Sequence, residues 1–357
     1  MSSWITVRPQ KTRLQNTPLQ NTPLQNTQLQ QLHVIHTLKV YYITNVFVGG
    51  SFKYIKDLIT LFSDITFIPI NNVNELRKQT FHSNDILLLQ YLVLSNISIR
   101  DIINVLKTKI RLIIPLHDFY YLTHSVNEFD ANIHNAYIKY NTISSEKIQL
   151  FNLAKYVICP TQFVKNEFSK YFNTHNFVVC PHIDYEITYQ KHIHDITNIN
   201  VGIINDFTEC KGIEYYKELF KINHYKYNIV YHIFTGNNTF CGPNIIIHPR
   251  YNNENIIQLL HENNIHSLLF LNKWAETYCY SLTHALRSSI SILYTNIGAF
   301  TERIPESDHY FPTTNDNIIN TFYKQLDYII NTKITASIPD NKRIIPEFYY
   351  NLFRSDN

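Results

Sequence analysis

The chain has 357 residues, 45% of them hydrophobic and 17% charged, so it is long enough for two domains with apolar cores, and disorder over its whole length is excluded. Its 31 basic and 28 acidic residues nearly balance, which argues against nucleic acid as a partner. The five cysteines are odd in number and form no Cys-x-x-Cys pair, which favours reduced core thiols in a cytoplasmic protein over disulfides or a zinc site.

The first residues of the chain differ from the rest. Residues 1–36 contain the tandem repeat LQNTP without a hydrophobic period, which predicts a disordered tail. No apolar run reaches the roughly 18 residues that a membrane-spanning helix needs, and no basic stretch followed by an apolar one opens the chain. We therefore expect no transmembrane segment and no secretion signal, while a peripheral membrane contact stays open.

Between residues 37 and 190, short β-branched runs alternate with helical stretches. An apolar strand before each helix is typical of a parallel sheet that is covered on both faces. This pattern predicts a first Rossmann-like domain. The expected strands are LKVYYITNVFV, ITFIPI, DILLLQYLVL, IRLIIPL, AKYVICP and NFVVCPH.

After a polar, His-rich stretch the same alternation returns between residues 191 and 335. It predicts a second parallel-sheet domain, with any ligand between the carboxyl ends of the two sheets. The expected strands are INVGIIN, YNIVYHIFTG, NIIIHP, IHSLLFL and ISILYT. The aromatic-rich residues 336–357 are expected either to pack back across the first domain or to form an ordinary edge segment.

Two candidate sites follow strands of the first domain. Gly49 and Gly50 open a helix, where free amides favour an anion or a sugar hydroxyl, although a simple tight turn explains them as well. His117 and Asp118 directly follow IRLIIPL. An imidazole there can meet a sugar hydroxyl or a leaving oxygen, and the acid can fix its tautomer or close the loop. The alternative is a structural hydrogen-bonding pair.

The second domain offers a cation and a carboxylate. Lys211 and Gly212 begin a helix, and a lysine beside helix amides suits a diphosphate. Glu276 is expected at the entrance of another helix, with His284 two turns further along the same face, so that both could meet one extended ligand. The alternatives are an exposed lysine, a helix-dipole charge at Glu276 and an ordinary half-buried histidine.

The stretch from Trp274 to Arg303 resembles the donor-binding segment of glycosyltransferase family 4, which comprises retaining enzymes of the GT-B fold. The likeness lies in a branch with Trp-Pro-Glu-Thr and a later Gly-Ala-Phe-x-Glu-Arg. It extends in the same order over about residues 39–330, through the Gly-Gly pair, His117-Asp118 and Lys211-Gly212. The matching residues of the segment are Trp274, Glu276, Thr277, Tyr280, Ser281, Leu282, Ala285, Gly298, Ala299, Phe300, Glu302 and Arg303.

The resemblance implies a two-domain GT-B protein that transfers a sugar, with retention, from a nucleotide-sugar donor to a glycan, lipid or protein acceptor. Lys211 would neutralise the diphosphate, Glu276 would face the sugar, and His117 would lie at the reacting carbon. Gly49, Gly50, Gly212, Tyr280, Ser281, His284 and Gly298 would complete the donor site. No Asp-x-Asp triplet is present, so we expect neither a metal nor a cofactor.

Two departures from the family keep other functions open. His284 stands where a second glutamate usually holds the ribose, and Asn205 and Asp206 stand near the place of a usual arginine. An arginine makes a bidentate phosphate contact that lysine does not replace. The chain could therefore be a degenerate GT-B protein that binds a glycan or a partner without catalysis. An epimerase of the same fold would need a hydrolysis-and-addition site that the sequence does not reveal.

Overall fold

We describe the protein from a computed structural model. The described residues are 4–5, 37–43, 49–90, 92, 95–122, 143–185, 198–222, 226–236, 240–333 and 342–354. Most of the segment expected to be a disordered tail, including its LQNTP repeat, lies outside them, as does most of the polar stretch between the two predicted domains.

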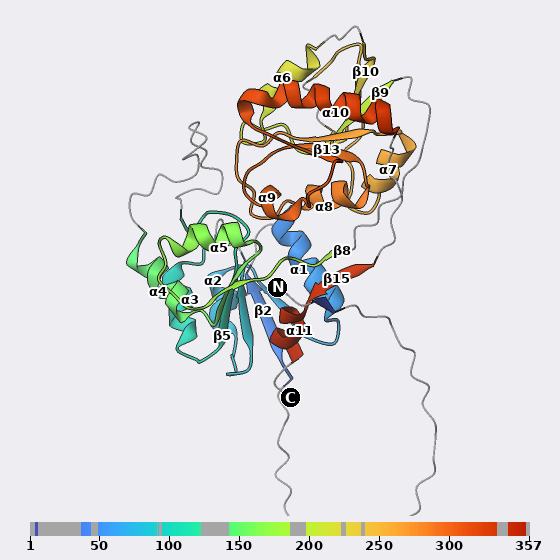
Figure 1. The fold of residues 1–357 in the computed structure, drawn as a ribbon. Coiled ribbons are helices and arrows are strands. Elements are labelled where there is room, and N and C mark those ends of the chain that lie inside the picture. Colours follow the sequence, from blue (N-terminus) through green and yellow to red (C-terminus); the bar gives the residue numbers. More distant parts are fainter. Residues whose placement is uncertain are drawn as a thin grey trace, which may run out of the picture.

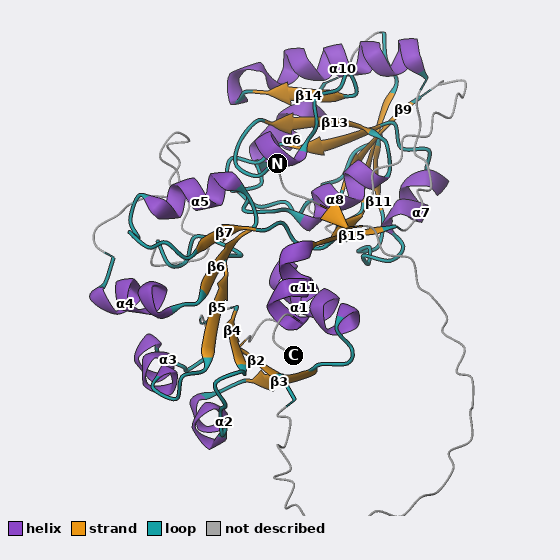
Figure 2. Cartoon of the chain, turned by 60° about the horizontal axis from the view of Figure 1, so that its bottom comes forward, coloured by secondary structure: helices purple, strands orange, loops and turns teal. Residues whose placement is uncertain are grey.

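The first domain contains a six-stranded parallel sheet in the order β3-β2-β4-β5-β6-β7. Helices α2 to α5 lie on one side of it, and α1 and α11 lie on the other (Figure 2). The strands are β2 (Lys39–Ile43), β3 (Thr66–Ile70), β4 (Ile86–Leu89), β5 (Arg111–Pro115), β6 (Tyr156–Cys159) and β7 (Phe177–Val179). The helices are α1 (Gly50–Leu61), α2 (Val73–Lys78), α3 (Ile99–Leu106), α4 (Ser145–Leu153) and α5 (Gln162–Ser169).

The second domain repeats this plan with the order β11-β10-β9-β12-β13-β14, again all parallel. Its strands are β9 (Ile199–Ile203), β10 (Ile229–Ile233), β11 (Ile245–Ile247), β12 (Ser267–Phe270), β13 (Ser291–Thr295) and β14 (Tyr310–Thr313). Its helices are α6 (Ile213–Phe220), α7 (Ile256–Glu262), α8 (Tyr280–Arg287), α9 (Phe300–Arg303) and α10 (Ile318–Thr332). The prediction of two parallel-sheet α/β domains is confirmed.

A small antiparallel sheet joins segments that are distant in the sequence. Its order is β1 (Trp4–Ile5), β15 (Arg343–Pro346) and β8 (Asp184–Tyr185). From β15 the chain enters α11 (Glu347–Arg354), whose Tyr349 and Phe353 pack with Tyr54 and Phe62 of the first domain. The last described helix therefore belongs to the core of the domain at the other end of the chain (Figure 1).

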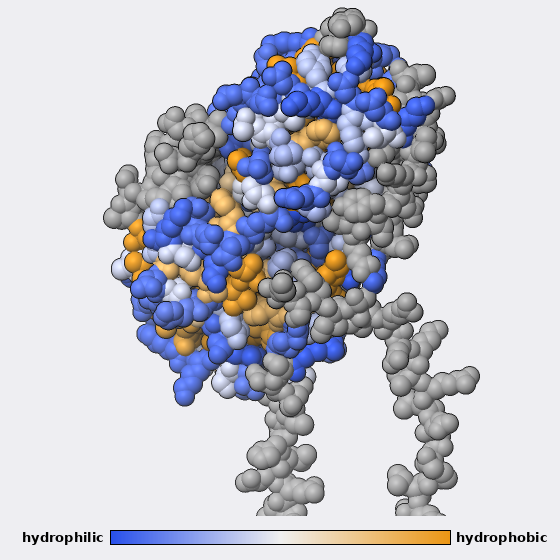
Figure 3. Space-filling view, in the orientation of Figure 1, coloured by the Kyte–Doolittle hydropathy of each residue, from blue (hydrophilic) through white to orange (hydrophobic). Residues whose placement is uncertain are grey.

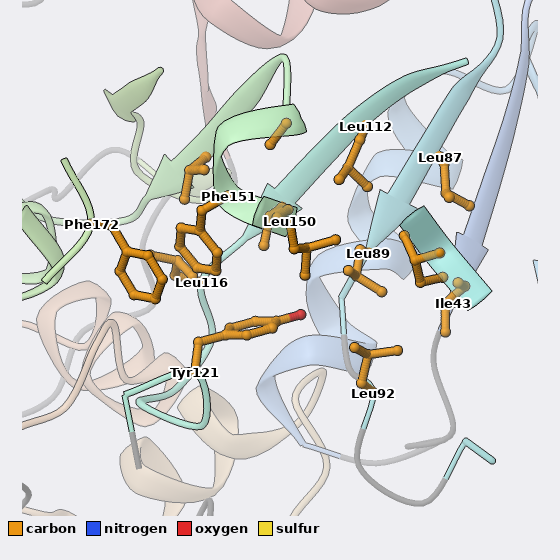
Figure 4. Packing of buried hydrophobic residues seen from close by; sticks show 14 of the residues in the cluster. Ile43, Leu87, Leu89, Leu92, Leu112, Leu116, Tyr121, Leu150, Phe151 and Phe172 are labelled. Carbon is orange, nitrogen blue, oxygen red and sulfur yellow. The ribbon is translucent and has the colours of Figure 1, made fainter. Parts of the chain in front are cut away.

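Each sheet is held by apolar side chains on both of its faces. In the first domain, Leu87, Leu89 and Leu112 belong to the same apolar cluster as Phe151 and Phe172 (Figure 4). Central strands such as β4 and β13 are buried on both faces, so they are continuous apolar runs like Ile86–Leu89 rather than alternating ones. Burial of this kind stabilises by about 25 cal/mol per Å2 of apolar surface, which makes the sheets rigid supports for their loops.

The strand order reverses once in each sheet. In the first domain it reverses between β2 and β4, and in the second between β9 and β12. In open parallel sheets, ligands bind outside the carboxyl ends of the strands at such reversals. The loops after β2, β9 and β12 carry Gly49, Lys211 and Glu276, so three predicted site segments lie where the topology favours a ligand.

Two features differ from the prediction. Strand β14 was not expected, because its short run contains Pro312, but proline is tolerated on an edge strand. Only Cys159 and Cys180 are buried, so the prediction of core thiols is wrong for Cys210, Cys241 and Cys279, although all five are unpaired.

The visible face in Figure 3 shows hydrophobic residues in small patches among hydrophilic ones. Within the described ranges, no helix is long and apolar enough to cross a membrane.

Candidate functional site

Lys211 and Glu276 form an ion pair at the carboxyl edge of the second sheet. Their side chains are 25% and 17% exposed, so both are sheltered and still within reach of a ligand. The two residues come from the loops after β9 and β12, the strands that flank the reversal of strand order. A fixed cation and a fixed carboxylate thus lie side by side where a ligand is expected.

Buried amides orient the carboxylate of Glu276. The side chain of Asn272 donates a hydrogen bond to Glu276 Oε1 over 2.8 Å. Asn205 in turn donates to Asn272 Oδ1 over 3.2 Å, and both asparagines are buried. Asn205 is one of the residues near the place of the usual arginine, and here it supports the acid instead of providing a charge. The role of Asn272 was not predicted, because a single asparagine after a strand does not by itself indicate a functional residue.

Two glycines allow the backbone of this site to pack closely. Gly212 has a φ of +75°, and a Cβ there would lie 1.9 Å from the carbonyl oxygen of Leu271. Gly298 has a φ of +59°, and a Cβ would lie 2.8 Å from both the amide nitrogen and the carbonyl oxygen of Glu276. Ala299 also donates its amide to that oxygen over 2.8 Å. Gly212 and Gly298 therefore hold the loops of Lys211 and Glu276 in place.

A second ion pair joins the loop after β12 to the helix that follows the loop of Lys211. Lys273, in the loop after β12, pairs with Glu214 of α6. The amides of Lys273 and Trp274 both donate to the carbonyl of Cys210, the residue before Lys211. Each loop therefore restricts the other, and the Lys211–Glu276 pair is held by contacts on both sides.

The position of Glu276 relative to α8 differs from the prediction. The helix begins at Tyr280, so Glu276 lies in the preceding loop, and His284 is one turn into the helix rather than two. Glu276 and His284 therefore do not share a helical face. Leu282, Ala285 and Leu286 face the core of the second domain and are buried.

Helix α8 presents an uncapped N-terminus. No side chain caps it, its first turn contains no acidic residue, and Cys279 before it has a φ of +71°. The Ser281 hydroxyl lies 3.2 Å from the hydroxyl of Tyr251. The start of this helix is therefore a place where an anion would be stabilised by backbone amides and the helix dipole.

His284 is a buried histidine with one bonded ring nitrogen. Its side chain is 3% exposed, Nε2 lies 3.1 Å from Asn253 Oδ1, and Nδ1 has no hydrogen-bond partner. Burial, aided by the charges of Arg287 and Lys53, lowers the pKa of His284 to about 4. The imidazole is therefore neutral at pH 7 and connects α8 to the loop before α7.

In the first domain, Gly49 and Gly50 open α1, as predicted. Gly49 has a φ of +84°, and no side chain caps the helix. A Cβ at Gly50 would lie 3.2 Å from the ring of Tyr280, so the start of α1 packs against the start of α8 (Figure 1). Two helix N-termini, one from each domain, meet at this contact.

His117 and Asp118 have different environments. Asp118 accepts the amide of Tyr120 over 2.8 Å, so it closes the loop, and burial raises its pKa to about 6. Burial lowers the pKa of His117 to about 3, and its Nε2 has no hydrogen-bond partner. The His117 ring contacts those of Tyr54 and His182. His182, buried in the segment between β7 and β8, was not identified from the sequence.

The backbone of His117 connects it to the acid of the second domain. Its carbonyl oxygen accepts a hydrogen bond from the hydroxyl of Thr277 over 2.6 Å. Thr277 directly follows Glu276, which is itself paired with Lys211. The three residues predicted to share a site are therefore linked through adjacent contacts, although no contact joins the His117 side chain to the ion pair.

The Gly-Ala-Phe-x-Glu-Arg segment binds the first domain. Glu302 accepts the backbone amides of Gln162 and Phe163 at the start of α5, over 2.7 and 2.5 Å. Arg303 pairs with Asp184 over 2.7 Å and donates to the carbonyl of Cys279 over 2.7 Å. This part of the resemblance therefore coincides with contacts that join the two domains.

No group of three or more histidine, cysteine or acidic residues in the described part of the chain is arranged to hold a metal ion.

Comparison with known proteins places the fold. No protein-family model matches the chain, and no curated protein does. The crystal structure of Anabaena HepE in complex with UDP has a TM-score of 0.59 and 12% identity, covering 84% of this chain and 92% of that one. The fold is GT-B.

Other solved structures share this fold. HepE in complex with UDP-glucose has a TM-score of 0.57 and 13% identity, covering 88% of this chain and 95% of that one. The lipopolysaccharide outer core galactosyltransferase WaaB has a TM-score of 0.55 and 11% identity, covering 84% of this chain and 91% of that one. At such low identities the likeness concerns the fold alone, and the chemistry must be argued from the site.

Proposed function

We propose that this protein is a glycosyltransferase that moves a sugar from a nucleotide-diphosphate sugar to a glycan, lipid or protein acceptor, with retention of configuration. The observation that carries the proposal is the Lys211–Glu276 ion pair at the reversal of strand order in the second sheet. The solved structures with this fold that contain UDP or UDP-glucose support the same class of donor. The unpaired cysteines fit a cytoplasmic protein.

In this proposal the donor diphosphate displaces Glu276 from Lys211. The ammonium and the amides at the start of α8, at Tyr280 and Ser281, take up the negative charge, which increases as the sugar–phosphate bond breaks. Glu276, oriented by Asn272, accepts hydrogen bonds from hydroxyls of the transferred sugar. These groups supply the charge stabilisation without a metal.

The acceptor hydroxyl attacks on the face from which the phosphate departs, and the departing phosphate takes its proton. His117 lies nearest to the reacting carbon on the first domain, where its neutral imidazole orients the sugar. Gly49 and Gly50 let the start of α1 approach the phosphate closely. The protein thus positions the two substrates and stabilises the developing charge. These two effects account for most of the catalysis in such a reaction.

A second candidate function is a degenerate GT-B protein that binds a glycan or a partner without turnover. The observation that favours it is His284, whose Nε2 is already bonded to Asn253 in the place of the usual ribose-binding glutamate. A binding protein would tolerate changes at Lys211 and Glu276, whereas an enzyme would lose most of its rate with either change.

A screen of nucleotide sugars separates the two candidates. Donors are tested by thermal shift and by release of nucleoside diphosphate, with wild type, Lys211→Ala and His284→Glu. We expect one donor class to stabilise the wild type, Lys211→Ala to abolish the shift, and His284→Glu to keep or strengthen it, because the Asn253 amide can donate to a carboxylate. If no nucleotide sugar shifts the wild type, the binding protein becomes the better description.

A further inference from the structure

Lys53 brings a cation from the first domain to the start of α8. It lies in the first turn of α1, where its amide donates to the carbonyl of Gly49 over 3.1 Å. Its ammonium lies 5.6 Å from the centre of the Tyr280 ring, and the lysine side chain is only 16% exposed. Sequence analysis identified Gly49 and Gly50 in this turn but gave no role to the lysine that follows them.

Lys53 lies where the starts of two helices meet. Helices α1 and α8 both begin without a side-chain cap and without an acidic residue in the first turn, and they meet where Gly50 packs on Tyr280. The dipoles of both helices therefore add positive potential at the place where the ammonium lies. The described acidic partner of Lys53 is Asp57, one turn further along α1.

Two buried histidines lie within range of the lysine's charge. Lys53 contributes to lowering the pKa of His284 on α8 and that of His182 at the end of β7, although burial is the main cause for both. The Nδ1 atoms of both rings have no hydrogen-bond partner. Both rings are therefore neutral at pH 7, and each has a ring nitrogen free to bond a ligand.

Asp57 positions the ammonium without using all of its hydrogens. Its two oxygens lie 2.7 and 2.6 Å from Lys53 Nζ, and its own side chain is 11% exposed. An ammonium group has three hydrogens to donate, so at least one remains for a further acceptor. An ion pair between residues four apart on a helix contributes little to stability, which gives little reason for placing one at a domain boundary.

We infer that Lys53 is a donor-binding residue of the first domain, which contacts the diphosphate at the start of α8. The inference rests on the proposed function. Lys53 would supply, from the first domain, part of the positive charge that an arginine near Asn205 and Asp206 usually supplies in the family that the sequence resembles. The diphosphate is then bound by both domains, so donor binding also draws them together.

The test measures binding of UDP, uridine and inorganic pyrophosphate by titration calorimetry. Lys53→Met keeps the apolar stem and removes the charge, and Lys56→Met on the exposed face of α1 is the matched control. We expect Lys53→Met to weaken UDP and pyrophosphate by about tenfold or more, the usual effect of losing one hydrogen bond to a charged group, and to leave uridine unchanged. Lys56→Met should change none of them.

The variant Asp57→Asn distinguishes an effect of the positive charge of Lys53 from an effect of its ion pair with Asp57. If the positive charge binds the ligand, this variant keeps or strengthens UDP binding, because the ammonium remains and a repulsive carboxylate is gone. If Asp57→Asn weakens UDP as much as Lys53→Met does, or if Lys53→Met weakens uridine equally, the pair is structural and the inference is wrong. Wild type that binds neither UDP nor pyrophosphate contradicts the proposed function itself, whereas normal UDP binding by Lys53→Met contradicts only this inference.

Discussion

Asn272 donates its side-chain amide to Glu276, and it does so from a fully buried position directly after β12. The carboxylate of Glu276 is therefore held in one orientation in the candidate site, where it also pairs with Lys211. Because the amide group is neutral, it orients the carboxylate without changing the charge of the site.

This contact predicts that Asn272→Ala lowers turnover more than it lowers donor binding. The variant should reduce kcat by about 10²-fold, the usual effect of displacing a positioned group by about 1 Å, while the Kd for UDP stays within a few fold. Steady-state kinetics and calorimetry on the same preparation check it. Asn104→Ala, on the exposed face of α3, is the control. Equal losses in kcat and in UDP affinity would show that Asn272 only maintains the fold.

Gly298 predicts a local effect on stability. Gly298→Ala places a Cβ 2.8 Å from backbone atoms of Glu276 at a φ of +59°, whereas Gly242→Ala meets its nearest neighbour at an ordinary 3.4 Å. We expect Gly298→Ala to lower the free energy of unfolding by about 1–3 kcal/mol and Gly242→Ala to change it by much less. Urea denaturation compares the two variants. Similar values would mean that the loop before α8 adapts to a side chain.

Glu302 predicts a contact between the domains that hydrogen exchange can measure. Its carboxylate accepts the amides of Gln162 and Phe163 at the start of α5. Glu302→Gln should make these two amides exchange faster and lower stability by about 1 kcal/mol, as the loss of a helix cap does. The exposed Glu306, changed to Gln, is the control. Unchanged protection at both amides would argue against this contact in solution.

The buried His284 predicts a dependence of stability on pH. Its folded pKa is about 4, below the usual 6.5, because burial favours the neutral ring. Below pH 6.5 the histidine is protonated in the unfolded chain but stays neutral in the folded one. Its contribution to the free energy of unfolding is therefore complete above pH 6.5 and is lost as the pH falls towards 4. The loss is about 1.4 kcal/mol per pH unit for this one group.

His284→Gln should remove that part of the slope, and the exposed His261→Gln should not. Urea denaturation between pH 7 and 4.5 gives both values. Asp118 acts in the opposite direction, because its folded pKa is raised to about 6, but it contributes equally to all three proteins. The same slope in wild type and His284→Gln would mean that the ring is charged in the folded protein.

Local patterns were sufficient to predict the two sheets. The central strands are short apolar runs because they are buried on both faces, and helices follow them at the usual spacing. The same alternation placed Lys211 and Gly212 at the start of a helix, which is α6. Four of the seven glycines, including Gly212 and Gly298, adopt a positive φ.

The contacts that complete the candidate site could not be predicted in this way. Lys53, Asn272 and His182 come from different elements, and their roles depend on which loops the sheets bring together. The start of α8 was placed too early, because nothing in the residues after Glu276 marks the turn at Cys279, which has a positive φ without being glycine. Strand β8 was missed, since its two residues pair with a segment from the other end of the chain.

The most direct test of the central claim is the equilibrium affinity for UDP of the wild type, Lys211→Ala and the exposed control Lys217→Ala. We predict that the wild type and Lys217→Ala bind UDP equally, and that Lys211→Ala binds it at least about tenfold more weakly, because it lacks the charged donor next to Glu276. The same affinity in all three proteins would contradict a diphosphate site at the Lys211–Glu276 pair.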